Sequence, residues 1–287
     1  MTTRLAPNPS LTTSSDTAVG PTTRRPRQRR SPGRMAPPQP RGTAPLRTAG
    51  TRHGIDTDLA ERSGTSTVVA FGDVHGCASL LERELERHYD SGAELIFLGD
   101  LIDRSPEPDG DRRVLERIWA LQANPGLWGL AGVTVLRGNH EQMLLDTLEE
   151  RLRLQEALAG AEPDEDGLFG EASDHWMWNG GRAEMLEWLM PHRDWFASLP
   201  YTAIRGSYLF VHAGIKPGVP LEQQTSEDLT WIRRPFLNRH HGLPYTVVHG
   251  HSITRGHRIE NHGHRINLDT GAFMSGVLSS MAFEIGS

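Results

Sequence analysis

Cysteine is almost absent from this chain of 287 residues, because Cys77 is the only one. A single thiol cannot form an intrachain disulfide, which excludes the class of small extracellular proteins that disulfides hold together. Long apolar runs are missing as well: no stretch approaches the ~18 residues of a membrane-spanning helix, and no apolar core of a secretory signal is present. We therefore expect a cytoplasmic protein with no membrane partner.

Acidic residues are scarce in the first 55 residues, which contain ten arginines and only Asp16. This segment is rich in Pro, Thr and Ser and has no apolar periodicity, so it cannot bury enough surface to offset the entropy lost on ordering. We predict an Arg- and Pro-rich disordered tail over residues 1–64 and one folded domain over 65–287. The role of the tail stays open, since its arginines could contact phosphate, a membrane or the domain itself.

The remainder of the chain is strongly acidic. The formal net charge of the whole chain is −6 and the first 55 residues carry +9, which leaves about −15 on the rest. Such an excess of negative charge argues against nucleic-acid binding by the folded domain.

Three β-like apolar runs are each followed by a polar loop and a helical pattern. Predicted strands over 67–71, 94–98 and 133–136 precede predicted helices over 79–89, 112–122 and 141–158. This alternation is typical of βαβ units in a mostly parallel sheet, whose ligand crevice lies beyond the carboxyl ends of the strands. We expect further helices near 182–190 and 193–198 and short strands over 201–205, 208–211, 245–248, 265–268 and 277–285. The predicted fold class is α/β, a two-sheet sandwich flanked by helices.

Five short motifs rich in acidic and imidazole side chains follow the β-like runs in a fixed order. They are GDVHG at 72–76, GDLIDR at 99–104, RGNHE at 137–141, HAG at 212–214 and HGH at 249–251. Asp, Asn and His supply the oxygen and nitrogen ligands that Mg, Mn, Zn or Fe ions use. Six ligands exceed the four of a tetrahedral zinc site, which predicts two divalent ions that share one carboxylate, the arrangement that cleaves phosphoesters. The candidate ligands are Asp73, His75, Asp100, Asn139, His212 and His249.

In this order the motifs resemble those of the calcineurin-like metallophosphoesterases, and more narrowly the bacterial branch of the phosphoprotein phosphatases. That branch includes small bacterial and phage Ser/Thr phosphatases and symmetrical diadenosine tetraphosphatases, and the resemblance spans residues 68–283. It implies a first metal held by Asp73, His75 and Asp100. It implies a second metal held by Asp100, Asn139, His212 and His249.

Two such ions would act on a water that they share. This water would lose a proton near neutral pH and attack phosphorus in line. Manganese is the favoured ion, with iron or zinc as alternatives, because the mixed ligand set discriminates weakly between them.

Residues beside the ligands indicate phosphoryl transfer. We assign His140 as the general acid for the leaving alkoxide, and the resemblance implies that Asp103 orients its imidazole. We expect Arg104 and Arg137 to bind phosphate oxygens through their guanidinium groups. A third arginine is expected from segment 229–234, where we favour Arg233 and keep Arg234 as the alternative.

The sequence leaves the substrate open. We favour a protein serine/threonine phosphatase that acts on a phosphorylated protein or a small phosphoester, because symmetrical diadenosine tetraphosphatases often lack the counterpart of Asp103. The alternatives are a symmetrical bis(5'-nucleosyl)-tetraphosphate hydrolase and a noncatalytic phosphoprotein-binding module. The oligomeric state is not indicated.

Residues outside the proposed ligand set carry further expectations. Ser105 stands where the family commonly has glycine, so the local turn can differ. His251 could be an outer hydrogen-bond partner of a ligand, and Asp269 could orient a ligand histidine or cap a turn. Five tryptophans could stack on a nucleobase, although helix packing is favoured: Trp176, Trp178, Trp188, Trp195 and Trp231.

Overall fold

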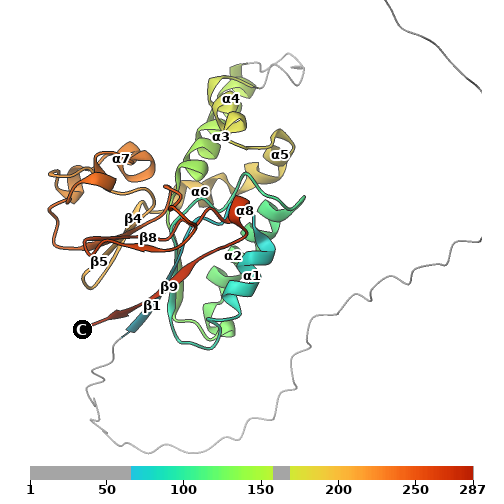
Figure 1. Cartoon of the computed structure of the whole chain (residues 1–287). Helices are drawn as coiled ribbons and strands as arrows, with labels where there is room; N and C mark the ends of the chain where they lie inside the picture. Colours follow the sequence, from blue (N-terminus) through green and yellow to red (C-terminus); the bar gives the residue numbers. More distant parts are fainter. Residues whose placement is uncertain (1–65, 158–168, 287) are drawn as a thin grey trace, which may run out of the picture. The chain divides into compact units, whose positions relative to one another are not determined.

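The computed structural model describes residues 66–157 and 169–286, so the tail predicted over 1–64 lies outside the described residues. Within the described part, the first sheet has the strand order β3-β2-β1-β9. Figure 1 shows β9 beside β1. Strands β1 (Ser66–Phe71), β2 (Glu94–Phe97) and β3 (Gly132–Val135) run parallel, and β9 (Ser280–Ile285) pairs antiparallel with β1. The three predicted βαβ strands are confirmed to within two residues.

The second sheet has the order β4-β5-β6-β8-β7. Its inner strands β5 (Tyr208–Val211), β6 (Thr246–His249) and β8 (Arg265–Asn267) are parallel. The edge strands β4 (Thr202–Arg205) and β7 (Glu260–Asn261) pair antiparallel with their neighbours.

Alternation of side chains along the strands joins the two sheets face to face. Val68 and Ala70 of β1 pack with Phe210 of β5, Val248 of β6 and Ile266 of β8 in one buried cluster. Val69 and Phe71 of β1 point the other way, into the cluster that the helices contribute to. The predicted two-sheet α/β sandwich is confirmed.

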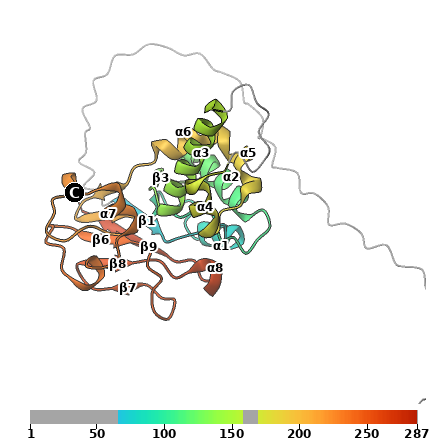
Figure 2. The ribbon, with the colours of Figure 1, turned by 90° about the horizontal axis from the view of Figure 1, so that it is seen from above.

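Helices cover both outer faces of the sandwich (Figure 2). Those over the first sheet include α1 (Ala78–Leu85), α2 (Gly110–Ala123), α3 (Asn139–Ala157), α4 (Glu171–Trp178), α5 (Leu186–Leu189) and α6 (Arg193–Ser198). Helix α7 (Ser226–Trp231) packs on the second sheet, and α8 (Ala272–Ser275) precedes β9. Short 3₁₀ turns lie at Pro125–Trp128, Ala183–Met185, Met190–His192, Leu221–Gln223 and Phe236–Asn238.

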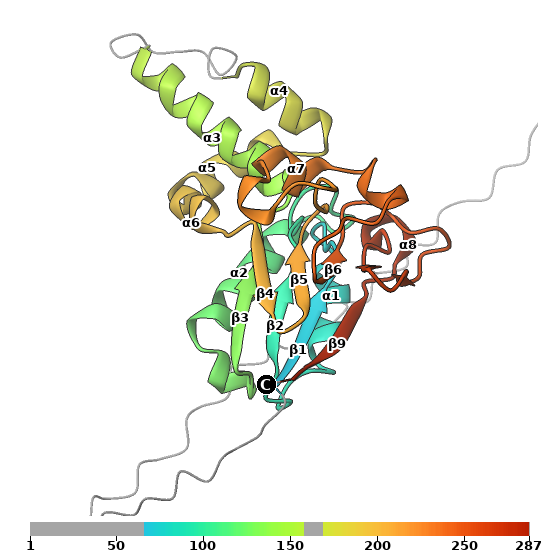
Figure 3. The same ribbon diagram turned by 90° about the vertical axis from the view of Figure 1, so that its left-hand side faces the viewer.

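Helix α3 begins directly at the motif after β3, and α4 packs along it. Figure 3 shows this helix pair beyond the ends of the strands that carry the motifs. None of the helices in the described ranges is long and apolar enough to cross a membrane.

An ion pair joins the edge strand β4 of the second sheet to β2 of the first. Arg205 of β4 donates from Nε and Nη2 to the two carboxylate oxygens of Glu94 in β2, at 2.7 and 2.6 Å, and Thr134 of β3 donates at 2.8 Å. Burial raises the pKa of Glu94, but the hydrogen bonds from Arg205 and Thr134 outweigh it and hold the pKa below its ordinary value of 4.5.

Glu94→Gln is expected to lower the free energy of unfolding by about 1 kcal/mol at neutral pH, because it removes a half-buried charge-assisted pair. The folded state lowers the pKa, so this contribution is present above the unfolded pKa and disappears as the pH falls through the folded value. Urea unfolding at neutral pH and at a pH well below 4.5 measures the difference in unfolding free energy between the variant and the wild type with the pair present and with it lost. Glu116→Gln, in a surface pair with Arg112, is the control with little expected effect. A difference that persisted in acid would contradict the ion-pair account.

Candidate metal centre

The loops after four strands bring their motif residues to one buried point. Asp73 follows β1, Asp100 follows β2, Asn139 opens α3 after β3, and His212 follows β5. Asp100 stands between two groups, since its Oδ2 lies 3.6 Å from His75 Nε2 and its Oδ1 lies 3.4 Å from His212 Nε2. Both sheets therefore contribute to the arrangement, with one carboxylate common to its two halves.

The backbone at the site is strained. A positive φ angle costs about 1–3 kcal/mol in a residue other than glycine, and such strain concentrates at functional sites. The described chain has seven such residues, and five of them belong to the motif loops: His75, Asp100, Asp103, Arg104 and His251.

Glu141 holds the strained loops in place. Its Oε2 accepts hydrogen bonds from the backbone N–H groups of Asp100 at 2.8 Å and Gly138 at 2.9 Å, and its Oε1 accepts from Leu101 at 2.7 Å. The side chain is fully buried, and burial raises its pKa to about 7. The sequence placed Glu141 in a motif without a role, and the structure makes it the link between the loops after β2 and β3.

Two of the candidate ligand histidines have a fixed tautomer. A carbonyl oxygen can only accept, so His75 Nδ1 donates to Ile102 O at 2.9 Å and His212 Nδ1 donates to Leu98 O at 3.0 Å. Burial lowers the pKa of His75 to about 3 and also lowers the pKa of His212, which keeps both rings neutral. The lone pair of each Nε2 then faces an oxygen of Asp100, a repulsive contact that a cation between the atoms would relieve.

The carboxylates lead to the same conclusion. Burial, and next the nearby charges of Asp269 and Asp100, raise the pKa of Asp73 well above its ordinary value. Among the described residues, the ion-pair partners of Asp100 are histidines only. Several buried acids without a lysine or arginine in contact fit the binding of divalent cations.

His249 differs from the expectation. As the last residue of β6 it shares the outward face of Val247, and its ring lies 5.0 Å from that of Phe236. Its Nδ1 donates to Gly250 O at 3.1 Å, and its Nε2 accepts from Arg265 Nη1 at 3.4 Å. Both ring nitrogens are thus engaged, which leaves no lone pair for a metal.

His251 takes the position expected for His249. Its Nδ1 lies 2.9 Å from Asn139 Oδ1. One of its ring nitrogens also lies within 4.8 Å of possible ligand atoms of Asp100 and His212. Its backbone N–H donates to both carboxylate oxygens of Asp73, at 3.2 and 3.0 Å. From the sequence, His251 was expected only as an outer hydrogen-bond partner of a ligand. The usable signal was its position in the loop after the strand, where Asp73 and Asp100 also lie.

The predicted acid and its partner are in contact. His140 Nδ1 lies 2.7 Å from Asp103 Oδ2, both residues are buried, and Nε2 of His140 is a buried atom with no hydrogen-bond partner. Burial opposes the charged imidazolium, but the carboxylates of Asp100 and Asp103 outweigh it and raise the pKa of His140. This imidazole can therefore carry a proton on Nε2.

A cavity of about 420 Å³ lies in front of these groups. Arg104 and Arg233 both line it, whereas Arg234 does not, which favours Arg233 as the third arginine. Arg104 donates from Nε to Asn179 O at 3.1 Å, and its guanidinium carbon lies 5.5 Å from the centre of the Phe273 ring. Other lining residues include Asp73, His75, Asp100, Asn139, His140, Trp231 and His251.

Arg137 does not reach this cavity, contrary to the expectation that it binds phosphate. Its Nη1 donates to Gln142 Oε1 and to Tyr201 Oη, both at 3.0 Å, and its Nη2 donates to Ala197 O at 2.6 Å. The guanidinium is used inside the fold, where it joins the start of α3 to the segment before β4.

The remaining candidates divide between packing and lining. Trp176 is buried, Trp178 is 91% exposed, and Trp231 lines the cavity. Asp269 also lines it and accepts a hydrogen bond from Gly271 N at 2.8 Å, so it caps a turn beside the site. Ser105 takes the place of the expected glycine with its hydroxyl bonded to Gly76 O at 2.9 Å.

Comparison with known proteins defines the class. The model of the calcineurin-like phosphoesterase family matches residues 66–271. The chain belongs to this family and is a hydrolase of phosphoric esters, with buried residue groups that could hold metal ions.

Two curated relatives align with this chain over different lengths. Serine/threonine-protein phosphatase 1 of Salmonella typhimurium is 29% identical over 227 residues, which span 72% of this chain and 88% of the relative. A symmetrical bis(5'-nucleosyl)-tetraphosphatase of Methylococcus capsulatus is 33% identical over 152 residues, which span 52% of this chain and 44% of that relative. The chain thus matches less than half of the second relative's length.

A solved structure shares the fold. The cold-active protein-tyrosine phosphatase of a Shewanella species superposes with a TM-score of 0.50 at 19% identity, and the match covers 77% of this chain and 76% of that one.

Proposed function

We propose that this protein hydrolyses phosphomonoesters, with the phosphorylated serine and threonine side chains of proteins as its substrates. The observation that carries the proposal is the buried pair of His140 and Asp103. The Nε2 of His140 has no hydrogen-bond partner and lies 3.9 Å from Oδ2 of the candidate metal ligand Asp100. A serine or threonine alkoxide is a poor leaving group that needs a proton, whereas the nucleotide phosphate released from a dinucleotide needs one much less.

The donor set fits two divalent cations, with manganese favoured and iron or zinc as alternatives. Asp73, His75 and Asp100 would hold the first ion. Asp100, Asn139, His212 and His251 would hold the second, with His251 in place of His249. When bound, such ions supply an activated water and neutralise charge on phosphate oxygens.

The chain's own residues would do the rest. Arg104, in the loop after β2, and Arg233, just after α7, both line the cavity and would orient the phosphate through their guanidinium groups. His140, protonated on both ring nitrogens, would give its Nε2 proton to the leaving oxygen, while its Nδ1–H stays hydrogen-bonded to the Asp103 carboxylate. Glu141 would keep the Asp100 loop in position.

Similarity along the chain supports the protein phosphatase over its main rival. The Salmonella typhimurium phosphatase aligns over 88% of its length, whereas the symmetrical tetraphosphatase aligns over 44%. The 33% identity to the latter nevertheless keeps symmetrical cleavage of bis(5'-nucleosyl) tetraphosphates as a second candidate function.

A parallel panel separates these candidates. The manganese-loaded protein is assayed on phosphoserine and phosphothreonine peptides, on p-nitrophenyl phosphate and on diadenosine tetraphosphate. We expect the phosphopeptides to be turned over with a kcat/KM at least about tenfold above that for the dinucleotide, in line with typical substrate discrimination. Faster release of ADP from the dinucleotide would reverse the assignment. No hydrolysis of any compound would favour a noncatalytic phosphoprotein-binding module.

A further inference from the structure

The carboxylate of Asp103 has a second partner that the sequence did not reveal. Its Oδ2 accepts a hydrogen bond from the indole Nε1 of Trp176 at 2.9 Å, in addition to its contact of 2.7 Å with His140 Nδ1. The three residues are 0–2% exposed. One oxygen atom is thereby fixed from two directions, which leaves little freedom for the carboxylate to rotate.

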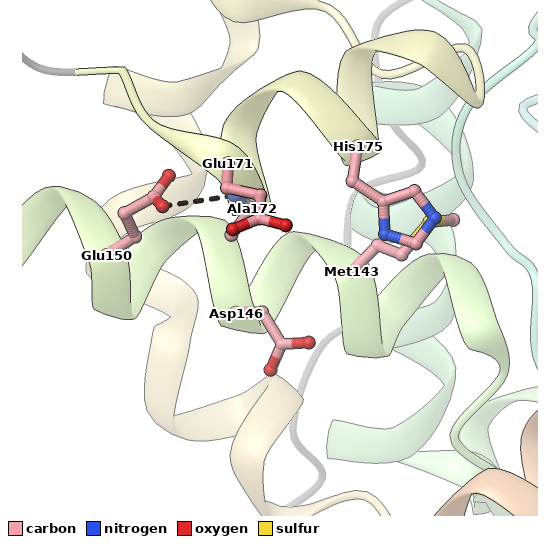
Figure 4. A pocket seen from close by; sticks show the side chains of 6 residues that line it. All are labelled: Met143, Asp146, Glu150, Glu171, Ala172 and His175. Carbon is pink, nitrogen blue, oxygen red and sulfur yellow. Dashed lines mark hydrogen bonds between the residues drawn. The ribbon is translucent and has the colours of Figure 1, made fainter.

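Helix α4, which carries Trp176, is anchored on α3. Glu150 of α3 accepts hydrogen bonds from the backbone N–H groups of Ala172 and Ser173 at 3.0 and 2.9 Å, and Figure 4 shows the first of these bonds. Thr147 of α3 also donates to Ala172 O at 3.2 Å. The start of α4 is therefore fixed to the same helix that begins with Asn139 and His140.

The other end of α4 is fixed as well. Gly181 N donates to Trp176 O at 3.1 Å, and a Cβ atom on Gly181 would lie 2.3 Å from the indole ring. The neighbouring Asn179 O accepts from Arg104 Nε, so residues 176–181 contact both Asp103 and the arginine that follows it. Both of those residues have a positive φ angle and need outside support.

We propose that Trp176 is a positioning residue for the reaction: its indole N–H holds Asp103 so that the Nε2 of His140 is directed at the leaving oxygen. This inference rests on the proposed phosphomonoesterase function. Trp176 also belongs to the apolar core. If its role were only structural, replacing it would lower the stability of the protein and would lower kcat equally for esters with good and poor leaving groups.

The first test compares Trp176→Phe with Trp195→Phe in manganese-loaded protein. Trp195 is the matched control, because its indole N–H also donates to one side-chain oxygen, that of Gln122 at 2.9 Å, away from the cavity. We expect Trp176→Phe to lower kcat about tenfold or more on phenyl phosphate, as typical for loss of an outer partner. The loss should be much smaller on p-nitrophenyl phosphate, whose leaving group hardly needs a proton, and the metal content should stay unchanged. Equal losses on both esters would overturn the proposal. So would a Trp176→Phe enzyme whose kcat values match those of Trp195→Phe.

A second variant displaces the indole without removing it. Gly181→Ala places a methyl group against the Trp176 ring and should give the same leaving-group-dependent loss. Gly126→Ala is its control, because a Cβ atom there meets no atom within 4 Å. An unaltered Gly181→Ala enzyme would count against the proposal even if Trp176→Phe failed to fold.

A spectroscopic readout is independent of turnover. In zinc-loaded, ¹⁵N-labelled protein, the hydrogen-bonded Nδ1 proton of His140 should shift or broaden in Trp176→Phe and stay in place in Trp195→Phe. An unshifted signal would refute the positioning role. If the wild-type protein hydrolysed neither ester, the proposed function would fail, while the His140 signal would still decide the role of Trp176.

Discussion

Replacing His251 by alanine is expected to remove one metal ion and to lower phosphoester turnover by more than about 100-fold, beyond the usual cost of losing an outer partner. The Nδ1 of His251 lies 2.9 Å from Asn139 Oδ1, within the group that contains Asp100 and His212. Loss of one imidazole from the proposed set would leave the second ion with three protein ligands.

His249→Gln is the matched control, since it alters the other histidine of the same HGH motif. Its ring nitrogens already bond to Gly250 O and Arg265 Nη1, and an amide side chain retains one donor and one acceptor. Elemental analysis after dialysis measures the metal content, and thermal unfolding checks that both variants fold. Loss of metal from His249→Gln with full occupancy in His251→Ala would restore the original assignment.

The two histidines of HGH show which features of the fold and site can be predicted from the sequence. Period-two and helical patterns locate the strands and helices because burial of alternate residues is a local property. The motifs then meet because the carboxyl ends of parallel strands share an edge. Which histidine of HGH is the candidate ligand depends on where β6 ends. His249 still obeys the strand alternation, whereas His251 lies in the loop with a φ of 62°.

Arg137 and Trp176 mark a different limit. Their partners come from distant segments: Tyr201 and Ala197 for the arginine, and Asp103 for the tryptophan. A local sequence pattern does not indicate which of several arginines hydrogen-bonds to distant segments of the fold. Arg104 and Arg233 reach the cavity, while Arg137, in an equally suggestive motif, stabilises the start of α3.

His140→Asn is expected to lower kcat by about 10²- to 10⁴-fold on esters with poor leaving groups, the usual contribution of general acid catalysis. The Nε2 of His140 is buried without a hydrogen-bond partner, His140 lines the cavity, and its Nδ1 contacts the Asp103 carboxylate at 2.7 Å. Asn139, which precedes it, is unchanged, so the metal content should stay near that of the wild-type protein.

The dependence on the leaving group separates an acid from a binding residue. Across a series of aryl phosphates, log kcat for the wild-type enzyme should depend weakly on the pKa of the leaving phenol, because His140 protonates the departing oxygen. In His140→Asn the negative charge stays on that oxygen, so the slope should steepen and the two enzymes should converge on p-nitrophenyl phosphate. His241→Asn, a buried histidine whose Nε2 bonds to His264 O at 2.9 Å away from the cavity, should keep the wild-type slope. Parallel lines for His140→Asn and the wild type would show that His140 binds the phosphate and does not donate the proton.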